Sequence, residues 1–165
     1  MMYLQAHASP AEKPCGIYAL SKMFTLKNIS FPEAQLVQQY QGKEQIPLNE
    51  MIKICRNNKM ECDGVKIDFE TLKKASLPVI TIVKPSHYVV ITEIRNDKVV
   101  YQSNQGAEIC PIGVFPDIWT GYTILFEKRL AQKYKKYLLS LKEKNDIKAG
   151  ICQCFPGLQF GDACS

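Results

Sequence analysis

The stretch LPVITIVKPSHYVVITEIRNDKVVYQ, residues 77–102, decides the fold. It holds three runs of β-branched and aromatic residues, the composition typical of strands: 79–83, 87–94 and 98–102. Asn96-Asp97 favours a tight turn between the last two runs. A fourth run of the same kind covers residues 122–127. The stretch therefore predicts an antiparallel sheet.

The chain ahead of this stretch has the spacing of helices instead. Apolar residues recur every three or four positions, beginning just after Pro14, and proline is favourable at a helix start. The predicted helices run from Cys15 to about Lys27, from Pro32 to Tyr40, from Leu48 to Lys59 and from Phe69 to Ala75, the last with Asp68 as N-cap. Helices followed by strands predict an α+β fold, with N-terminal helices packed on one face of an antiparallel β-sheet.

Residues 128–148 carry most of the positive charge of the chain. The whole chain has a net charge of +5, and this segment alone holds eight Lys or Arg against two Asp or Glu. Because the rest is close to neutral, nucleic acid is disfavoured as the main partner. The segment also has an apolar stripe at helical spacing, which predicts one basic amphipathic helix over 129–148.

Three interpretations of this basic segment stay open. It packs its stripe on the sheet, or it contacts an anionic membrane surface peripherally through residues 128–154, with Cys152 and Cys154 as acylation sites. Alternatively, Ala149-Gly150 mimics a leader junction, so that the chain processes itself. Residues 149–165 have no periodicity and are expected to form a loosely ordered, cysteine-rich tail.

The 165 residues correspond to one compact domain. No apolar run is long enough to cross a bilayer and no secretory signal is visible, so a cytosolic location is expected. The seven cysteines are then expected to be reduced thiols. Cys152 and Cys154 are separated by a single residue, with no histidine near them, which disfavours a structural zinc site.

Cys15 is the candidate nucleophile. It stands at a predicted helix N-terminus, where unpaired N–H groups favour a thiolate, and Gly16 removes side-chain bulk beside the sulfur. The other interpretation is that Cys15 is an inert core residue. His87, at the entry of a strand, is the candidate base, since its neutral-range titration suits proton exchange with a thiol. His7 is the weaker alternative.

A histidine base also needs a group that orients its ring. The predicted hairpin that leaves His87 returns to Gln102 and Asn104. Either amide oxygen could accept the imidazole N–H. A neutral orienter stabilises an imidazolium less than a carboxylate does, so modest activity is expected.

Several motifs, in this order, resemble the leader-peptidase domain of bacteriocin and peptide exporters. The motifs are Pro14-Cys15-Gly16, His87-Tyr88-Val89-Val90, the hairpin ending at Gly106, and the segment 115–121 before an apolar strand. The resemblance covers about residues 5–128. It implies a papain-like cysteine-protease fold over 1–128 and cleavage of precursor peptides after a double-glycine-type motif on the cytosolic side.

By this resemblance, Cys15 is the nucleophile and His87 the general base, and no metal or cofactor is needed. The chain departs from the family pattern at two places. Gln102-Ser103 stand where the family has Asp-Pro, so the third catalytic role falls on Gln102, with Asn104 as a neighbouring substitute. The family also has an oxyanion-hole glutamine six residues before the cysteine, where this chain has Ser9, with Gln5 four residues earlier.

The sequence thus predicts a cysteine peptidase that cleaves a peptide or small protein, through a thioester. Acyl transfer through the same intermediate is not separable from hydrolysis by sequence. The alternative is a catalytically weak peptide-binding or interaction module of the same fold. Trp119, near a strand start, is expected to fill the core rather than to contact substrate.

Overall fold

The computed structural model describes residues 13–43 and 45–149. The helices are α1 (Cys15–Leu26), α2 (Glu33–Gln39), α3 (Leu48–Asn57), α4 (Phe69–Lys74), α5 (Phe115–Ile118), α6 (Leu130–Lys133), the 3₁₀ turn η1 (Lys135–Tyr137) and α7 (Leu141–Asp146). The strands are β1 (Ile46–Pro47), β2 (Asp63–Lys66), β3 (Val79–Val83), β4 (His87–Ile94), β5 (Lys98–Ser103), β6 (Gly106–Pro111), β7 (Trp119–Leu125) and β8 (Lys148–Ala149).

The main sheet has six strands in the order β2-β7-β3-β4-β5-β6, and every neighbouring pair is antiparallel. The predicted turn at Asn96-Asp97 is confirmed, because β4 and β5 form a hairpin there and Arg95 N–H donates to Lys98 O at 2.9 Å. Strands β2 and β6 were not predicted. The four helices predicted before residue 77 and the sheet that follows them are confirmed to within a few residues at each end.

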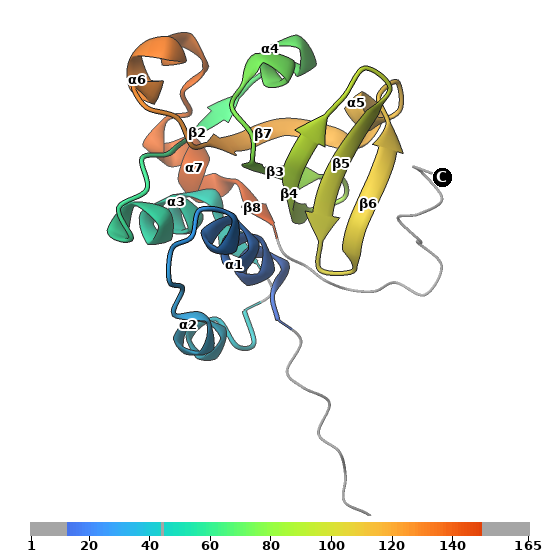
Figure 1. Cartoon of the computed structure of the whole chain (residues 1–165). Helices are drawn as coiled ribbons and strands as arrows, with labels where there is room; N and C mark the ends of the chain where they lie inside the picture. The colour runs from blue at the N-terminus through green and yellow to red at the C-terminus, as the bar shows by residue number, and fades with distance from the viewer. Residues whose placement is uncertain (1–12, 44, 150–165) are drawn as a thin grey trace, which may run out of the picture.

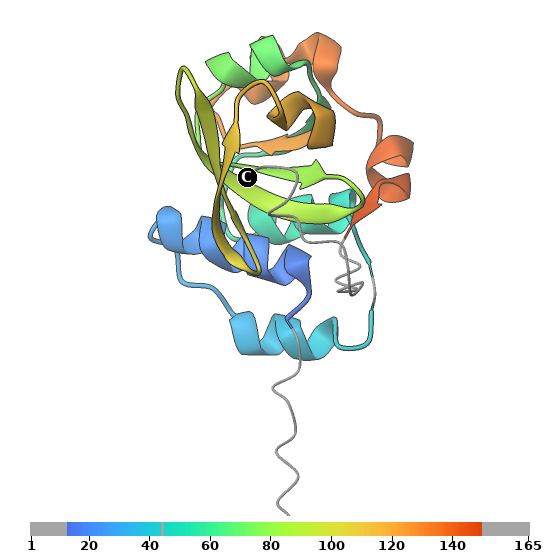
Figure 2. The ribbon, with the colours of Figure 1, turned by 90° about the vertical axis from the view of Figure 1, so that its right-hand side faces the viewer.

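The alternation of side chains along β4 divides the interior into two cores (Figures 1 and 2). Tyr88 and Val90 face the first core, beneath α1, α2 and α3. Val89 and Ile91 face the second core, which α4, α5 and α6 cover from the other side. The N-terminal helices α1 to α3 therefore pack on one face, as predicted, but α4 lies on the opposite face.

Asp68 caps α4 as its sequence predicts, with its Oδ1 accepting the Thr71 N–H at 2.7 Å. The prediction for Trp119 is also confirmed. Trp119 is 8% exposed and its Nε1 donates to Thr81 Oγ1 at 2.7 Å. Trp119 is therefore a residue of the second core.

The prediction of one amphipathic helix over 129–148 is wrong. The segment forms α6, η1, α7 and the short strand β8 instead. The helix breaks at Leu138, whose extended backbone makes an isolated bridge with Val65, while Leu139 N–H donates to Gly64 O. Leu130, from its predicted apolar stripe, enters the second core, whereas Leu139, outside that stripe, enters the first. The predicted tail covered 149–165; its first residue, Ala149, belongs to β8, and residues 150–165 lie outside the described residues.

Polar contacts hold this C-terminal segment against the main sheet and the short strand β1. Glu127 accepts hydrogen bonds from Tyr134 Oη at 2.6 Å and Lys133 Nζ at 2.8 Å. Lys144 Nζ lies 3.0 Å from Asp63 Oδ1, and β8 pairs with β1. The segment thus packs on the same body as the helices and the sheet. Across the described part of the chain, no helix combines the length and apolar character that crossing a bilayer requires.

Candidate active site

Cys15 is the first residue of α1, directly after the N-cap Pro14. Its sulfur accepts a hydrogen bond from the backbone N–H of Tyr88, with a nitrogen–sulfur distance of 3.4 Å. The predicted position at a helix N-terminus is confirmed. Cys15 is only 1% exposed. Its side chain is buried where α1 packs against β4 in the first core.

His87 stands beside this thiol because it immediately precedes Tyr88 in β4. Two covalent bonds separate the Tyr88 nitrogen from the Cα atom of His87. That Cα therefore lies within about 6 Å of the Cys15 sulfur. Cys15 and Tyr88 are 73 positions apart in the chain, so the fold alone brings the thiol and the histidine together. His87 is half-buried, at the rim of the sheet.

Gly16 has a packing role that differs from the predicted one. A Cβ atom at this position would lie 3.0 Å from Ile46 Cδ1, 3.1 Å from Met51 Sδ and 3.3 Å from Tyr88 Cδ2. The missing side chain thus lets α1 approach the core closely, instead of leaving space for a substrate carbonyl.

Tyr88 is held rigidly between Cys15 and Ile46. Its hydroxyl donates to Ile46 O at 2.7 Å, and its side chain is buried. Burial raises the pKa of Tyr88 well above its usual value, and the neighbouring Cys15 and Glu50 add to the rise. The phenol therefore stays neutral, and its hydrogen bond to Ile46 fixes the strand that presents both Tyr88 N–H and His87.

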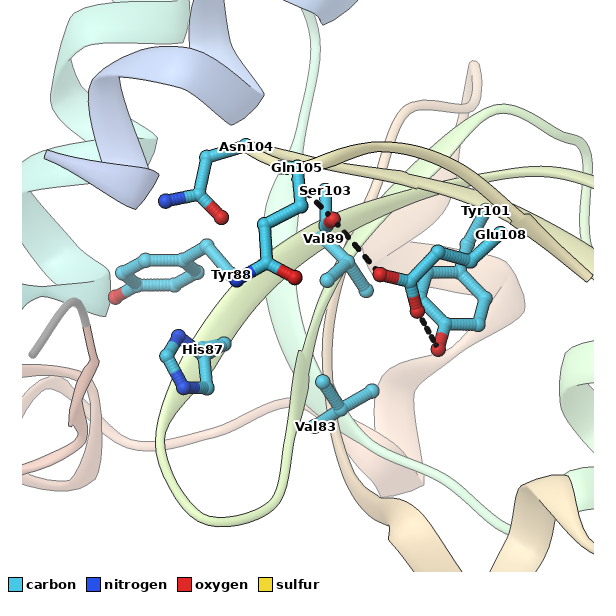
Figure 3. A pocket seen from close by; sticks show the side chains of 9 residues that line it. All are labelled: Val83, His87, Tyr88, Val89, Tyr101, Ser103, Asn104, Gln105 and Glu108. Carbon is cyan, nitrogen blue, oxygen red and sulfur yellow. Dashed lines mark hydrogen bonds between the residues drawn. The ribbon is translucent and has the colours of Figure 1, made fainter. Parts of the chain in front are cut away.

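A pocket opens beside His87 at the end of the hairpin (Figure 3). Its lining comes from β3, β4, β5, β6 and the β5–β6 turn: Val83, His87, Tyr88, Val89, Tyr101, Ser103, Asn104, Gln105 and Glu108. Figure 3 shows Asn104 and Gln105 extending from the turn toward Tyr88 and His87. The structure thus brings Asn104 to the same pocket as His87. Gln102 is not among the lining residues and pairs with Val90 inside the sheet.

A carboxylate in this pocket escaped the sequence analysis. Glu108, in β6, accepts hydrogen bonds from Tyr101 Oη at 2.6 Å and Ser103 Oγ at 3.2 Å. It lies opposite Tyr101 in the β5–β6 register. The sequence signal was the polar hairpin around Gly106, whose register would have placed Glu108 across from Tyr101. Because β6 was not predicted, only the residues at the turn, Gln102 and Asn104, became candidates for orienting His87.

The remaining candidates fall outside this region or outside the described residues. Gln5, His7 and Ser9 are not among the described residues. The four cysteines of the described part, Cys15, Cys55, Cys62 and Cys110, are buried. Within that part, no group of three or more His, Cys, Asp or Glu side chains could hold a metal ion. The chemistry available at the site is that of a thiol, an imidazole and nearby amide and carboxylate groups.

The model of the Peptidase C39 family matches residues 5–145. The chain has no significant match among curated proteins. Several crystal structures share its fold. One is a double glycine motif protease from an AMS/PCAT transporter in complex with the leader peptide, with a TM-score of 0.65 and 21% identity, over 72% of this chain and 86% of that one.

Two further structures are similar. The peptidase domain of Streptococcus ComA, a bi-functional ABC transporter involved in quorum sensing, has a TM-score of 0.60 and 18% identity, over 68% of this chain and 90% of that one. The N-terminal peptidase C39-like domain of the toxin secretion ATP-binding protein from Vibrio parahaemolyticus has a TM-score of 0.58 and 14% identity, over 72% of this chain and the whole of that one. The predicted papain-like α+β fold and the resemblance to leader-peptidase domains are confirmed.

Proposed function

Because the chain belongs to the Peptidase C39 family, we propose that it is a cysteine peptidase that cleaves a peptide or small protein through a thioester. The observation that carries the proposal is the hydrogen bond from Tyr88 N–H to the Cys15 sulfur, since it holds the thiol beside His87. A thiol next to an imidazole can pass its proton to the ring and become a strong nucleophile.

In the proposed mechanism, His87 accepts the thiol proton and the Cys15 sulfur attacks the scissile carbonyl carbon. The carbon–sulfur bond forms, and the tetrahedral oxyanion is stabilised by the Cys15 backbone N–H at the start of α1. The carbon–nitrogen bond then breaks, and the imidazolium returns its proton to the leaving amine. Water, deprotonated by His87, hydrolyses the thioester and releases the free thiol.

Asn104 is the better supported of the two proposed orienting residues. It lines the pocket with His87, whereas Gln102 does not. The second oxyanion donor, proposed as Gln5 or Ser9, stays a prediction. The cytosolic location and the peripheral membrane contact of residues 128–154 also stay predictions.

The proposed substrate is a peptide cut after a Gly-Gly-type junction. Two observations support it: the motifs that resemble leader peptidases, and the similar fold of a double glycine motif protease whose structure holds a leader peptide. A small-residue junction also suits a buried nucleophile, since glycine allows the peptide backbone to approach a thiol closely.

Incubation with synthetic peptides that carry a central Gly-Gly pair, followed by mass spectrometry, tests this function. We expect cleavage directly after the pair by the unchanged chain, and none by Cys15→Ala or His87→Ala. Cys55→Ala is the matched control, because Cys55 is equally buried but lies away from His87 in α3. Cleavage that survives Cys15→Ala would refute the proposal.

The burial of Cys15 favours one alternative, a peptide-binding module of the same fold with weak catalysis. Cys15→Ser separates the two functions, because it preserves the shape of the site and removes the nucleophile. A peptidase loses cleavage with this change. A binding module keeps its affinity for the Gly-Gly peptide in a fluorescence-anisotropy titration, and its unchanged form cleaves the peptide weakly at most.

A further inference from the structure

The β5–β6 turn is held in place by a chain of hydrogen bonds that begins at Glu108. The Tyr101 hydroxyl donates to one carboxylate oxygen of Glu108, and the Ser103 hydroxyl donates to the other. The Ser103 oxygen in turn accepts the Gln105 N–H at 3.1 Å. The carboxylate is thus linked through one hydroxyl to the backbone of the turn that carries Asn104.

This chain of contacts ends in the pocket that His87 lines. Ser103, Asn104, Gln105 and Glu108 all belong to its lining, opposite His87 and Tyr88 (Figure 3). A peptide turn with two exposed amide side chains has many accessible conformations. The Ser103 hydroxyl, held by Glu108, reduces the number of these conformations because it also binds the Gln105 N–H. Holding Ser103 therefore helps to hold Asn104 at the pocket.

Glu108 also contributes charge. Among the described residues, several titratable or charged groups surround His87, by lining its pocket or by acting on its strand and turn: Cys15, Glu50, Tyr88, Tyr101, Glu108, Lys84 and Lys148. Of the two acidic residues, Glu108 is the one that lines the pocket. A negative charge near an imidazole stabilises its protonated form, and the thiolate–imidazolium pair of a cysteine peptidase needs that form.

We propose that Glu108 is a positioning residue of the candidate active site. Through Ser103 it fixes the turn that presents Asn104, and across the pocket it supplies the negative charge that Gln102-Ser103 lack. The inference rests on the proposed function. It places the acidic component of the site on β6, one strand beyond the position where the sequence resemblance locates it.

The test measures how fast iodoacetamide alkylates Cys15, by mass spectrometry of the peptide that contains it. At pH 9.5 an ordinary thiol is mostly thiolate, so the rate there reports access to the sulfur. At pH 6 an ordinary thiol reacts about 300-fold more slowly, so a fast rate there reports the thiolate–imidazolium pair. The ratio of the two rates thus separates a change in the thiolate–imidazolium pair from a change in access to the Cys15 sulfur.

For Glu108→Gln we expect the pH 6 rate to fall about threefold or more, with the pH 9.5 rate unchanged. A structural role alone would lower both rates together, and that outcome overturns the proposal. An unchanged ratio also overturns it. Glu93→Gln is the matched control, because Glu93 is a carboxylate of the same sheet that pairs with Arg95 outside the pocket, and we expect no change.

Ser103→Ala is the second variant, which keeps the charge but cuts the link to the turn. We expect the pH 6 rate to fall, by less than for Glu108→Gln, with the pH 9.5 rate unchanged. If Glu108→Gln does not fold, this variant decides, and an unchanged ratio of its two rates overturns the proposal. The proposed function fails separately. If the unchanged chain already shows the 300-fold ratio of an ordinary thiol, and His87→Ala leaves it there, no reactive pair exists and Glu108 has nothing to position.

Discussion

Tyr88 contacts Cys15 through its backbone, because its N–H points at the sulfur across the interface between α1 and β4. An N–H donor favours a thiolate over a thiol, as any hydrogen bond to the charged form does. The same residue anchors its ring to Ile46 on the far side. The position of the candidate nucleophile therefore depends on how closely α1 and β4 pack.

Gly16→Ala tests this dependence on packing. The new methyl group would press on the ends of Ile46, Met51 and Tyr88, which lie 3.0–3.3 Å from it. We expect a loss of about 1–3 kcal/mol in the free energy of unfolding, and slower cleavage, because α1 must shift away from Tyr88. Gly113→Ala is the control, since its Cβ meets nothing within 4 Å, and it should change neither quantity. Equal effects of the two changes in urea denaturation would contradict this account.

Tyr88→Phe removes one hydroxyl and leaves the Ile46 carbonyl without that donor in a buried site. We expect a loss of roughly 1–3 kcal/mol in the free energy of unfolding. Hydrogen exchange should speed up locally at β1 and β8, because Ile46 pairs with Ala149. Exchange that accelerates evenly over the whole sheet would show that the hydroxyl has no local role.

Thr81→Val removes the centre of a buried polar cluster. The Thr81 hydroxyl accepts from Trp119 Nε1, donates to Tyr122 O, and lies 2.9 Å from Thr123 Oγ1. The substitution keeps the volume but leaves the indole N–H unpaired, so we expect a loss of roughly 1–3 kcal/mol. Thr92→Val, on β4 with one longer bond of 3.3 Å to Val100 O, should cost clearly less in the same thermal or urea unfolding experiment.

The contribution of Glu127 to the free energy of unfolding should depend on pH, and Glu127→Gln tests this. Burial raises the pKa of Glu127, but hydrogen bonds from Lys133, Tyr134 and the Ser76 N–H outweigh it and lower the pKa overall. A folded pKa below the unfolded value of about 4.3 means that the ionised carboxylate stabilises the fold above that pH and loses this effect as the pH falls through the folded value. At pH 7 we expect Glu127→Gln to cost roughly 1.5–3 kcal/mol.

The difference in unfolding free energy between the two proteins should then shrink between pH 5 and pH 3. Urea denaturation at four or five pH values measures it. A gap that stays constant down to pH 3 would exclude Glu127 as the titrating group.

The order of helices and strands was accessible from sequence because it follows periodicity. Residues 79–94 are rich in β-branched side chains, and Asp68 is a standard N-cap, so local chemistry and fold agree there. The failure at 128–148 has a tertiary cause. Leu130 and Leu139 belong to different cores, and between them the extended backbone of Leu138 forms a bridge with Val65. Periodicity does not reveal on which side of a sheet a side chain ends.

The candidate site was accessible only in part, for a related reason. Cys15 and His87 follow from helix and strand starts combined with a family resemblance. The position of Glu108 in the site is evident only from the pairing of β5 with β6. Apolar and polar residues alternate too weakly in β6 for its sequence to predict a strand. The sequence left the burial of Cys15 open, because it depends on how close Gly16 allows α1 to come.

The short ribbon of β1 and β8 has a mechanical consequence. Ala149 pairs with Ile46. The Ile46 carbonyl accepts a hydrogen bond from the Tyr88 hydroxyl, and the backbone N–H of Tyr88 donates to the Cys15 sulfur. Tension applied to the chain beyond Ala149 would peel this two-residue ribbon before it strained any strand of the large sheet. Traction on the carboxyl end would thus reach the thiol through Tyr88.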